Sequence, residues 1–331
     1  MSQNYRAQQQ PQQHATAPLV PYKAADGETV SIIPKSMIWL VTFNTFLLPA
    51  WVNPFRHVGM RDRLARLFQD NNVLRLADIL CLQETFSRQD EILGHAAALG
   101  FKHVVLAKKP TMCQRANMRL LGSGLMIISK HDIVESSEEE LPVGVWTDYF
   151  AMKSVMHARV STEAGEVHVF NAHTQAQIHS RREDASTQVR IQQLEAISAF
   201  VRMKVAEHPN LPVIICGDMN VDNISRPDEF SKMLQLFMEA IPDHRLKEVL
   251  ECREIPTWGG TQRLDYIFVG THKYSEECDV TQAQTECFGD FSDHRGVSAA
   301  VNFAESEYSP DLCPVENQRG ALALTSCSFI K

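Results

Sequence analysis

Six places along this chain put an acidic, amide or imidazole side chain at the end of an apolar run or within it. They are Asn44 after IWLVTF, Glu84 after DILCLQ, His173 after VHVFNA, Asp218 and Asn220 after PVIICG, Asp265 within QRLDYIFV, and Asp293 with His294 before GVSAAV. One such residue alone is typical of a turn or a cap. Six of them indicate a ligand site, because loops from several strands converge at the strand ends of layered α/β folds.

The residue types favour chemistry on a phosphate group. Carboxylates and amides without cysteines suit a hard cation such as Mg²⁺, which keeps several waters and also binds substrate phosphate. Such an ion acts as a Lewis acid on a phosphoryl oxygen. A histidine beside a carboxylate transfers protons near neutral pH. Together, these side chains predict hydrolysis of a phosphoester by an activated water.

The elements that must position these residues are short apolar strands interspersed with amphipathic helices. The Val, Ile and Leu runs are nearly continuous, which is typical of strands covered on both faces. Strands are predicted at 38–43, 78–82, 103–107, 125–129, 151–160, 167–172, 212–216, 264–269 and 296–301. Helices are predicted at 59–70, 88–99 and 183–204, with one or two more within 226–250. The pattern therefore predicts an α/β protein.

Composition limits the classes of protein that remain. The 331 residues are 44% hydrophobic and 22% charged, with a net charge of -8, which indicates a globular chain with one large domain or two small ones. The acidic balance argues against binding nucleic acid by bulk electrostatics, which requires concentrated Lys and Arg. It leaves open an enzyme that meets phosphates through a metal ion.

The eight cysteines are interpreted as reduced, non-catalytic thiols. Cys81 and Cys216 lie within apolar runs, where a small buried thiol is common. The others form no Cys-x-x-Cys pair and no zinc spacing. Reduced thiols favour an intracellular setting.

Three segments are predicted along the chain: a disordered Gln-rich tail at 1–27, a catalytic domain at 28–303 and a loosely packed tail at 304–331. The first residues lack the apolar core of a secretory signal. The apolar run at 37–52 is interrupted by Asn44 and Pro49 and is shorter than the roughly 20 residues of a membrane span. We therefore expect a cytoplasmic protein, peripheral at membranes and without a transmembrane segment.

The set of polar motifs resembles the endonuclease/exonuclease/phosphatase (DNase-like) superfamily, because the motifs occur in the order and spacing of that superfamily. The motifs are TFNT, LQETF, CGDMNV, RLDYIFV and FSDHRGV, spread over residues 38–301. The resemblance implies a four-layered α/β/β/α sandwich of two mixed β-sheets flanked by helices. It also implies hydrolysis of phosphoesters with Mg²⁺.

Within that superfamily the chain is most similar to the neutral sphingomyelinase branch. GSGLMIISK resembles a glycine-containing strand of the branch, and NAHTQA resembles the stretch with its second histidine. TDYFAMKSV matches the pattern D-[YW]-F-x-x-K-G, except that Ser154 stands where a glycine is usual. The resemblance implies cleavage of sphingomyelin, or of a related phospholipid at a membrane surface, to a ceramide and phosphocholine.

The resemblance also implies a role for each matching residue. Glu84 would be the direct Mg²⁺ ligand with Asn44 near the same ion, and Mn²⁺ is a possible substitute. Asp218 and Asn220 would position the attacking water and a phosphate oxygen. His294 would be the general base, oriented by Asp265 and supported by Asp293. The remaining roles are phosphate binding or leaving-group protonation by His173, and shaping of the head-group side by Asp148, Tyr149 and Lys153.

Simpler interpretations stay open at several of these positions. His173 could be a satisfied core histidine, Asp265 a strand-end ion pair, and Lys153 a solvated strand residue. Gly122 and Gly124 could mark a turn. Other functions also stay open: a phospholipase C on a related lipid, an inositol-phosphate phosphatase, a nuclease, or a silent interaction module. The complete polar set argues against the silent module, and the low Lys and Arg total argues against the nuclease.

The apolar loop LLPAWVNPF directly follows Asn44. We hypothesise that Leu48, Trp51 and Phe55 lie at the rim of the cleft and enter a lipid surface, because interfacial aromatic residues anchor proteins there. The alternative is that they fill the core behind the first strand.

Changing Trp51 to Ala should therefore weaken binding to liposomes while sparing hydrolysis of a soluble phosphocholine ester. Sedimentation with liposomes and a colorimetric ester assay measure the two effects. An equal loss of liposome binding and of ester hydrolysis would contradict the hypothesis.

Overall fold

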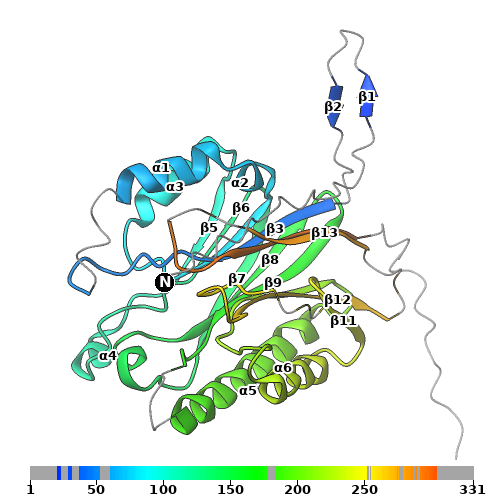
Figure 1. Ribbon diagram of the computed structural model, residues 1–331. Helices are drawn as coiled ribbons and strands as arrows, with labels where there is room; N and C mark the ends of the chain where they lie inside the picture. The colour runs from blue at the N-terminus through cyan, green and yellow to red at the C-terminus, as the bar shows by residue number, and fades with distance from the viewer. Residues whose placement is uncertain are drawn as a thin grey trace, which may run out of the picture.

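The computed structural model describes residues 21–23, 29–31, 37–52, 60–177, 183–251, 253, 255–273, 275, 279–286, 288 and 291–303. Two six-stranded sheets lie face to face, and helices cover the outer side of each sheet (Figure 1). Both sheets combine parallel and antiparallel pairs. The predicted four-layered α/β/β/α sandwich is therefore confirmed.

The first sheet has the strand order β13-β14-β3-β4-β6-β5. Its strands are β3 (Met37–Asn44), β4 (Ile79–Gln83), β5 (His103–Leu106), β6 (Met126–Ser129), β13 (Asp279–Glu286) and β14 (Gly296–Asn302). Only β3 and β4 run parallel among these pairs, so both end at the same edge of the sheet. The helices on this side are α1 (Met60–Asp70), α2 (Asn72–Leu76) and α3 (Gln89–Ala98).

The second sheet has the strand order β11-β12-β10-β9-β8-β7. Its strands are β7 (Asp132–Glu140), β8 (Ser154–Thr162), β9 (Gly165–His173), β10 (Val213–Asp218), β11 (His244–Glu248) and β12 (Asp265–His272). Helices α5 (Glu183–Glu207) and α6 (Pro227–Ala240) pack on its outer face (Figure 1). Pro227 at the start of α6, followed by Asp228 and Glu229, suits a helix N-terminus.

Smaller elements complete the described chain. They are the helix α4 (Met112–Ala116), the 3-10 helix η2 (Trp146–Phe150), and a separate pair of strands, β1 (Pro21–Lys23) and β2 (Thr29–Ser31). Three residues of the segment predicted to be disordered therefore form a strand. Residues 1–20 and 304–331 lie outside the described residues, so the other predictions for the two tails remain predictions.

The core has three apolar layers that match the four layers of the fold. Ile38, Ile79, Met156 and Ile214 belong to the layer between the sheets. A second layer joins β9, β10 and β12 to α5 and α6, and a third joins β3, β4 and β6 to α1 and α3. Central strands are thus covered on both faces, as their continuous apolar runs predict.

The predicted strands and the three long helices are confirmed, with one correction. Residues 244–248, expected to be helical, form strand β11, in which His244 and Glu248 are buried and Arg245 is exposed. A five-residue strand at the sheet edge is too short to show a clear period of two. Sequence reasoning also missed β7 and β13, whose polar side chains reflect their places at the sheet edges.

Two buried histidines lie in contact on the second sheet, away from the polar strand ends. His157 Nε2 lies 3.0 Å from His168 Nδ1, and Ser137 Oγ lies 3.4 Å from His157 Nδ1. Burial lowers the pKa of His157 to about 3 and that of His168 to about 4. Both rings are therefore neutral in the folded protein at neutral pH.

These depressed pKa values predict an acid-sensitive fold. Between about pH 6.5 and 4 these two histidines bind protons in the unfolded chain but not in the folded chain. The free energy of unfolding therefore decreases as the pH falls. The expected loss is about 1.4 kcal/mol per pH unit for each histidine. Chemical denaturation of His168→Gln at several pH values should show a shallower acid loss than the unchanged protein.

Comparing His168→Gln with the unchanged protein separates the contribution of His168 from that of carboxylates that titrate in the same pH range. His103→Gln on the edge strand β5 is the matched control and should keep the original slope. An unchanged slope in His168→Gln would contradict the assignment.

Candidate active site

Three site residues lie in one row across the second sheet. In the strand register, Asp218 at the end of β10 is opposite both His173 of β9 and Asp265 of β12. All three side chains are buried. Gly217 makes the approach of β9 and β10 possible, because a Cβ there would lie 2.0 Å from the carbonyl oxygen of Ala172. Sheet register alone therefore brings together residues from three separate motifs.

Asn44 joins the first sheet to this row. Its Nδ2 atom donates to Glu84 Oε1 at 3.2 Å and to Asp218 Oδ2 at 2.9 Å. Just below, Gln83 Nε2 donates to Asn171 Oδ1 at 2.7 Å, which also links the two sheets. Because β3 and β4 end side by side, Asn44 and Glu84 meet the second sheet at the same level.

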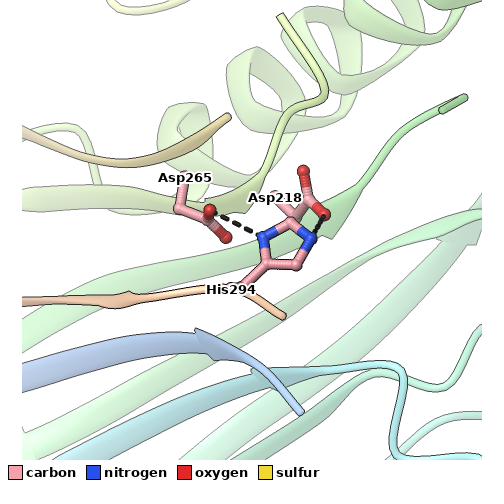
Figure 2. Close-up of side chains that lie close together, drawn as sticks. All are labelled: Asp218, Asp265 and His294. Carbon is pink, nitrogen blue, oxygen red and sulfur yellow. Dashed lines mark hydrogen bonds and ion pairs between the residues drawn. The ribbon is translucent and has the colours of Figure 1, made fainter. Parts of the chain in front are cut away.

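His294 lies between two aspartates (Figure 2). Its Nδ1 atom is 2.9 Å from Asp265 Oδ2, and its Nε2 atom is 3.7 Å from Asp218 Oδ2. Burial opposes the charged ring, yet the carboxylates of Asp265 and Asp218 raise the pKa of His294 to about 10. The pairing with Asp265 favours the proton on Nδ1 and leaves Nε2 facing the other site residues. The predicted contact between Asp265 and His294 is therefore present, and the role of His294 as a general base remains a prediction.

His173 faces the same space from the opposite side. Its Nε2 atom lies 3.3 Å from Lys153 Nζ, 3.7 Å from Asp218 Oδ2 and 3.9 Å from Glu84 Oε1. Burial, with the nearby charges of Lys153 and His294, holds the pKa of His173 well below its usual range. A neutral imidazole and a lysine cation therefore stand together in this part of the site.

Lys153 is buried in the wall of the site, and its predicted role on the head-group side remains a prediction. Its side chain is only 3% exposed and contacts both His173 and Asp148 Oδ2, the latter at 3.4 Å. Asp148 also accepts a hydrogen bond from the backbone N–H of Ala176 at 2.8 Å. The open interpretation of Lys153 as a solvated strand lysine is wrong, because the side chain is buried among site residues.

A cavity of about 170 Å³ opens between these side chains. Its lining includes Glu84, Asp148, His173, Asp218, Asn220, Asp293 and His294. Tyr149 is not among the lining residues; its side chain is exposed, and its ring packs against Phe150. The geometry thus gathers most of the predicted residues but leaves Tyr149 outside.

Six lining residues are not among the predicted site residues: Phe46, Ala176, Gln177, Trp258, Gln262 and Leu264. Trp258 Nε1 donates to Asp293 Oδ2 at 3.1 Å, so the exposed Asp293 contacts the indole at the mouth of the cavity. Its predicted support of a metal-water network remains a prediction. Trp258 lies in the turn sequence TWGG just before the Asp265 motif, and a large aromatic residue in such a turn is the signal that could have identified it.

Three of the seven non-glycine residues with positive φ in the described chain lie at this site. Phe46, Glu84 and Asn220 have positive φ values of 51°, 55° and 49°. Side chains other than glycine rarely adopt this conformation, and the packed surroundings must maintain it. The strain supports a functional assignment for these strand ends.

The side chains present fit a divalent cation. Glu84 Oε2 is buried and has no hydrogen-bond partner among the described residues. Burial raises the pKa of Glu84 to about 7 and that of Asp218 to about 6, which shows how much these carboxylates lack a compensating charge. Ligand atoms of Asp218, Asp265 and His294 also lie within 4.8 Å of one another and could hold an ion.

The predicted membrane-contact residues are only partly described. Trp51 is 65% exposed, whereas Leu48 is half-buried, and Phe55 lies outside the described residues. The interpretation that Trp51 fills the core is therefore wrong. In the parts of the chain that the structure covers, no helix is both long and apolar enough to cross a bilayer.

Known proteins with related sequences include several lipid-cleaving enzymes. The chain is 27% identical to a phospholipase C of Staphylococcus aureus over 301 residues, covering 78% of this chain and 86% of that protein. It is 26% identical to a sphingomyelinase C of Bacillus cereus over 223 residues, covering 62% of this chain. The chain spans 64% of the length of the Bacillus enzyme. A sphingomyelinase of Dictyostelium discoideum is 25% identical over 50% of this chain, and the chain spans 43% of the length of that protein.

Solved structures show the same fold. The beta toxin of Staphylococcus aureus matches with a TM-score of 0.63 at 21% identity, over 79% of this chain and 99% of that one. The TDP2 protein of D. rerio, in complex with a single-strand DNA product, matches with a TM-score of 0.56 at 17% identity, over 81% and 99% of the two chains. The expectation that nucleic acid is no partner gains no support from this set.

The sequence profile of the Endonuclease/Exonuclease/phosphatase family matches residues 41–294, which include every strand end of the site. The chain belongs to this family. Its sphingomyelinase relatives confirm the resemblance to the neutral sphingomyelinase branch, and family and relatives together support a hydrolase.

Glu84→Gln should bind Mg²⁺ at least tenfold more weakly, because it removes the charge of the predicted ligand. In the unchanged protein, affinity should fall as the pH drops below about 7, since protons then compete for Glu84 and Asp218. Isothermal titration with Mg²⁺ alone measures both effects.

Glu195→Gln on the exposed side of α5 is the matched control and should leave the titration unchanged. Equal Mg²⁺ affinity in the two variants would contradict the assignment of Glu84.

Proposed function

We propose that this chain is a Mg²⁺-dependent phosphodiesterase that hydrolyses sphingomyelin to ceramide and phosphocholine. The observation that carries the reaction type is the His294 imidazole held by Asp265, facing a buried carboxylate cluster with the partnerless Glu84 Oε2. The sphingomyelinase and phospholipase C relatives support the choice of substrate. Mn²⁺ is the proposed substitute ion.

In the proposed ion site, Glu84 is the direct ligand and Asn44 lies near the same ion, beside Glu84. A bound Mg²⁺ would supply Lewis-acid activation of a phosphoryl oxygen and partial compensation of the buried carboxylates. That compensation matters for His294, whose pKa of about 10 reflects the uncompensated Asp265 and Asp218 charges. A general base must be neutral at the working pH, so a lower pKa in the loaded enzyme is part of the proposal.

His294 accepts a proton from the attacking water through Nε2, while Asp265 keeps the ring oriented through Nδ1. Asp218 and Asn220 position the water and a phosphate oxygen. Asn220 is held for this by its Nδ2 bond to the carbonyl oxygen of Thr174 at 3.2 Å.

On the other side, His173 would bind a phosphate oxygen or protonate the leaving alkoxide, from a buried position beside Asp218 and Glu84. Lys153 supplies the positive charge beside it, because its Nζ atom is 3.3 Å from the His173 ring. The ion pair with Asp148 fixes the position of that cation. Charge developing on the phosphate would therefore be stabilised from this side.

We further propose that the protein acts in the cytoplasm, as a peripheral protein at a membrane surface. The described cysteines Cys81, Cys113 and Cys216 are free, which is compatible with a reducing compartment.

Hydrolysis of a substrate panel tests the proposed function. Sphingomyelin liposomes, phosphatidylcholine liposomes, inositol phosphates and single-strand DNA are compared, each with Mg²⁺ or with EDTA. We expect cleavage of sphingomyelin only with the metal. Activity that persists in EDTA would contradict the metal assignment, and cleavage of DNA but not sphingomyelin would overturn the substrate.

His294→Ala should lower turnover of the preferred substrate by about 10²–10⁴-fold, the usual contribution of a positioned base. His103→Ala, on the edge strand β5, is the control for an unrelated histidine and should retain full turnover. Comparable activity in the two variants would remove His294 from the mechanism.

A further inference from the structure

Helix α4 has an unusual place in the fold, because none of its side chains is buried. The helix is closed locally by a capping box, in which Thr111 and Gln114 exchange hydrogen bonds. Met112 is 83% exposed, and Met118 and Leu120 just beyond the helix are also exposed. Packing against the core therefore does not explain the apolar side chains of this segment.

The 3-10 helix η2 extends the same exposed apolar surface. The backbone N–H groups of Leu120 and Leu121 donate to the carbonyl oxygen of Phe150 at 2.9 and 3.2 Å. Trp146, Tyr149 and Phe150 are all exposed. We define the α4–η2 patch as Met112, Met118, Leu120, Trp146, Tyr149 and Phe150.

The α4–η2 patch adjoins the mouth of the candidate active site. Asp148 belongs to the same five-residue helix η2 and lines the site cavity. In Figure 1, α4 and the loop after β3 both project from the same end of the two sheets. That loop carries the exposed Trp51. Whatever covers the patch is thus held beside the opening of the site.

Charge around the patch is suited to phosphate groups. Lys109 and Arg115 are exposed and form no ion pair within the described chain. Two carboxylates of β7 near the patch are already engaged, since Glu138 accepts from Lys108 N–H and Glu140 pairs with Arg119. Exposed apolar side chains flanked by cations are typical of surfaces that enter the head-group region of a bilayer.

We propose that the α4–η2 patch docks on the surface of a phospholipid bilayer, with its apolar side chains among the head groups and acyl chains. Lys109 and Arg115 then meet lipid phosphates. A second copy of the chain is the less favourable occupant, because a symmetric contact would bring the same cations together and cover the site mouth. The inference rests on the proposed function, which requires access to a lipid head group.

Vesicle sedimentation in EDTA tests the docking without hydrolysis. The full chain is mixed with phosphatidylcholine vesicles that lack sphingomyelin, so binding does not depend on turnover. The double variant Met112→Ser/Met118→Ser should partition about tenfold more weakly, because less apolar surface leaves water. The matched control is Met203→Ser/Met238→Ser, which changes two methionines that are 52% and 54% exposed on α5 and α6.

Both double variants should keep the turnover of a soluble phosphocholine ester and the thermal unfolding temperature. Equal vesicle binding by the two double variants would overturn the proposal, as would absence of binding by the unchanged protein. Light scattering tests whether a second copy of the chain occupies the patch. If the unchanged protein is a dimer and Met112→Ser/Met118→Ser is a monomer, the patch is a contact between two copies. Failure of the substrate panel with vesicle binding intact would overturn the proposed function and leave the docking surface in place.

Discussion

The face-to-face packing of two sheet edges is the constraint on which the candidate site depends. Asn44 donates to Glu84 and also to Asp218, which lies 174 positions further along the chain. Gln83 and Asn171 form a second bridge directly below. Buried polar bridges of this kind are costly unless fully satisfied, so they permit few alternative alignments of the sheets. A slip of either sheet would separate the ligand atoms.

The packing places several carboxylates close together, and the neighbouring side chains do not fully compensate their negative charge. Glu84, Asp218 and Asp265 are gathered at the site cavity, with Lys153 and His294 as the facing cations. Burial raises the pKa of the two carboxylates nearest Asn44, and a carboxylate oxygen stays without a partner. Strained backbone at Glu84 and Asn220 adds to the cost. A cation that binds such a site would stabilise the folded chain, and its binding would then be linked to folding.

The same end of the molecule combines a polar interior with an apolar rim. Trp258 and Phe46 line the cavity, and the exposed side chains of η2 begin on the turn that also carries Asp148. A short 3-10 helix can do both because its side chains point in several directions within one turn. One segment thus contributes both to the lining of the cavity and to the exposed apolar surface beside it.

The sequence by itself determined the class of fold, nine of the twelve strands in the two six-stranded sheets and most of the site residues. Continuous apolar runs followed by Asn, Asp, Glu or His are local signals, and they need no knowledge of tertiary contacts. The polar edge strands β7 and β13, the short strand β11 and the cavity residue Trp258 were missed, since their roles come from neighbours distant in sequence. Only the tertiary structure decided that Lys153 is buried beside His173 while Tyr149 and Trp51 face outward. Burial depends on which elements pack against a residue, and that packing is set by contacts across the two sheets.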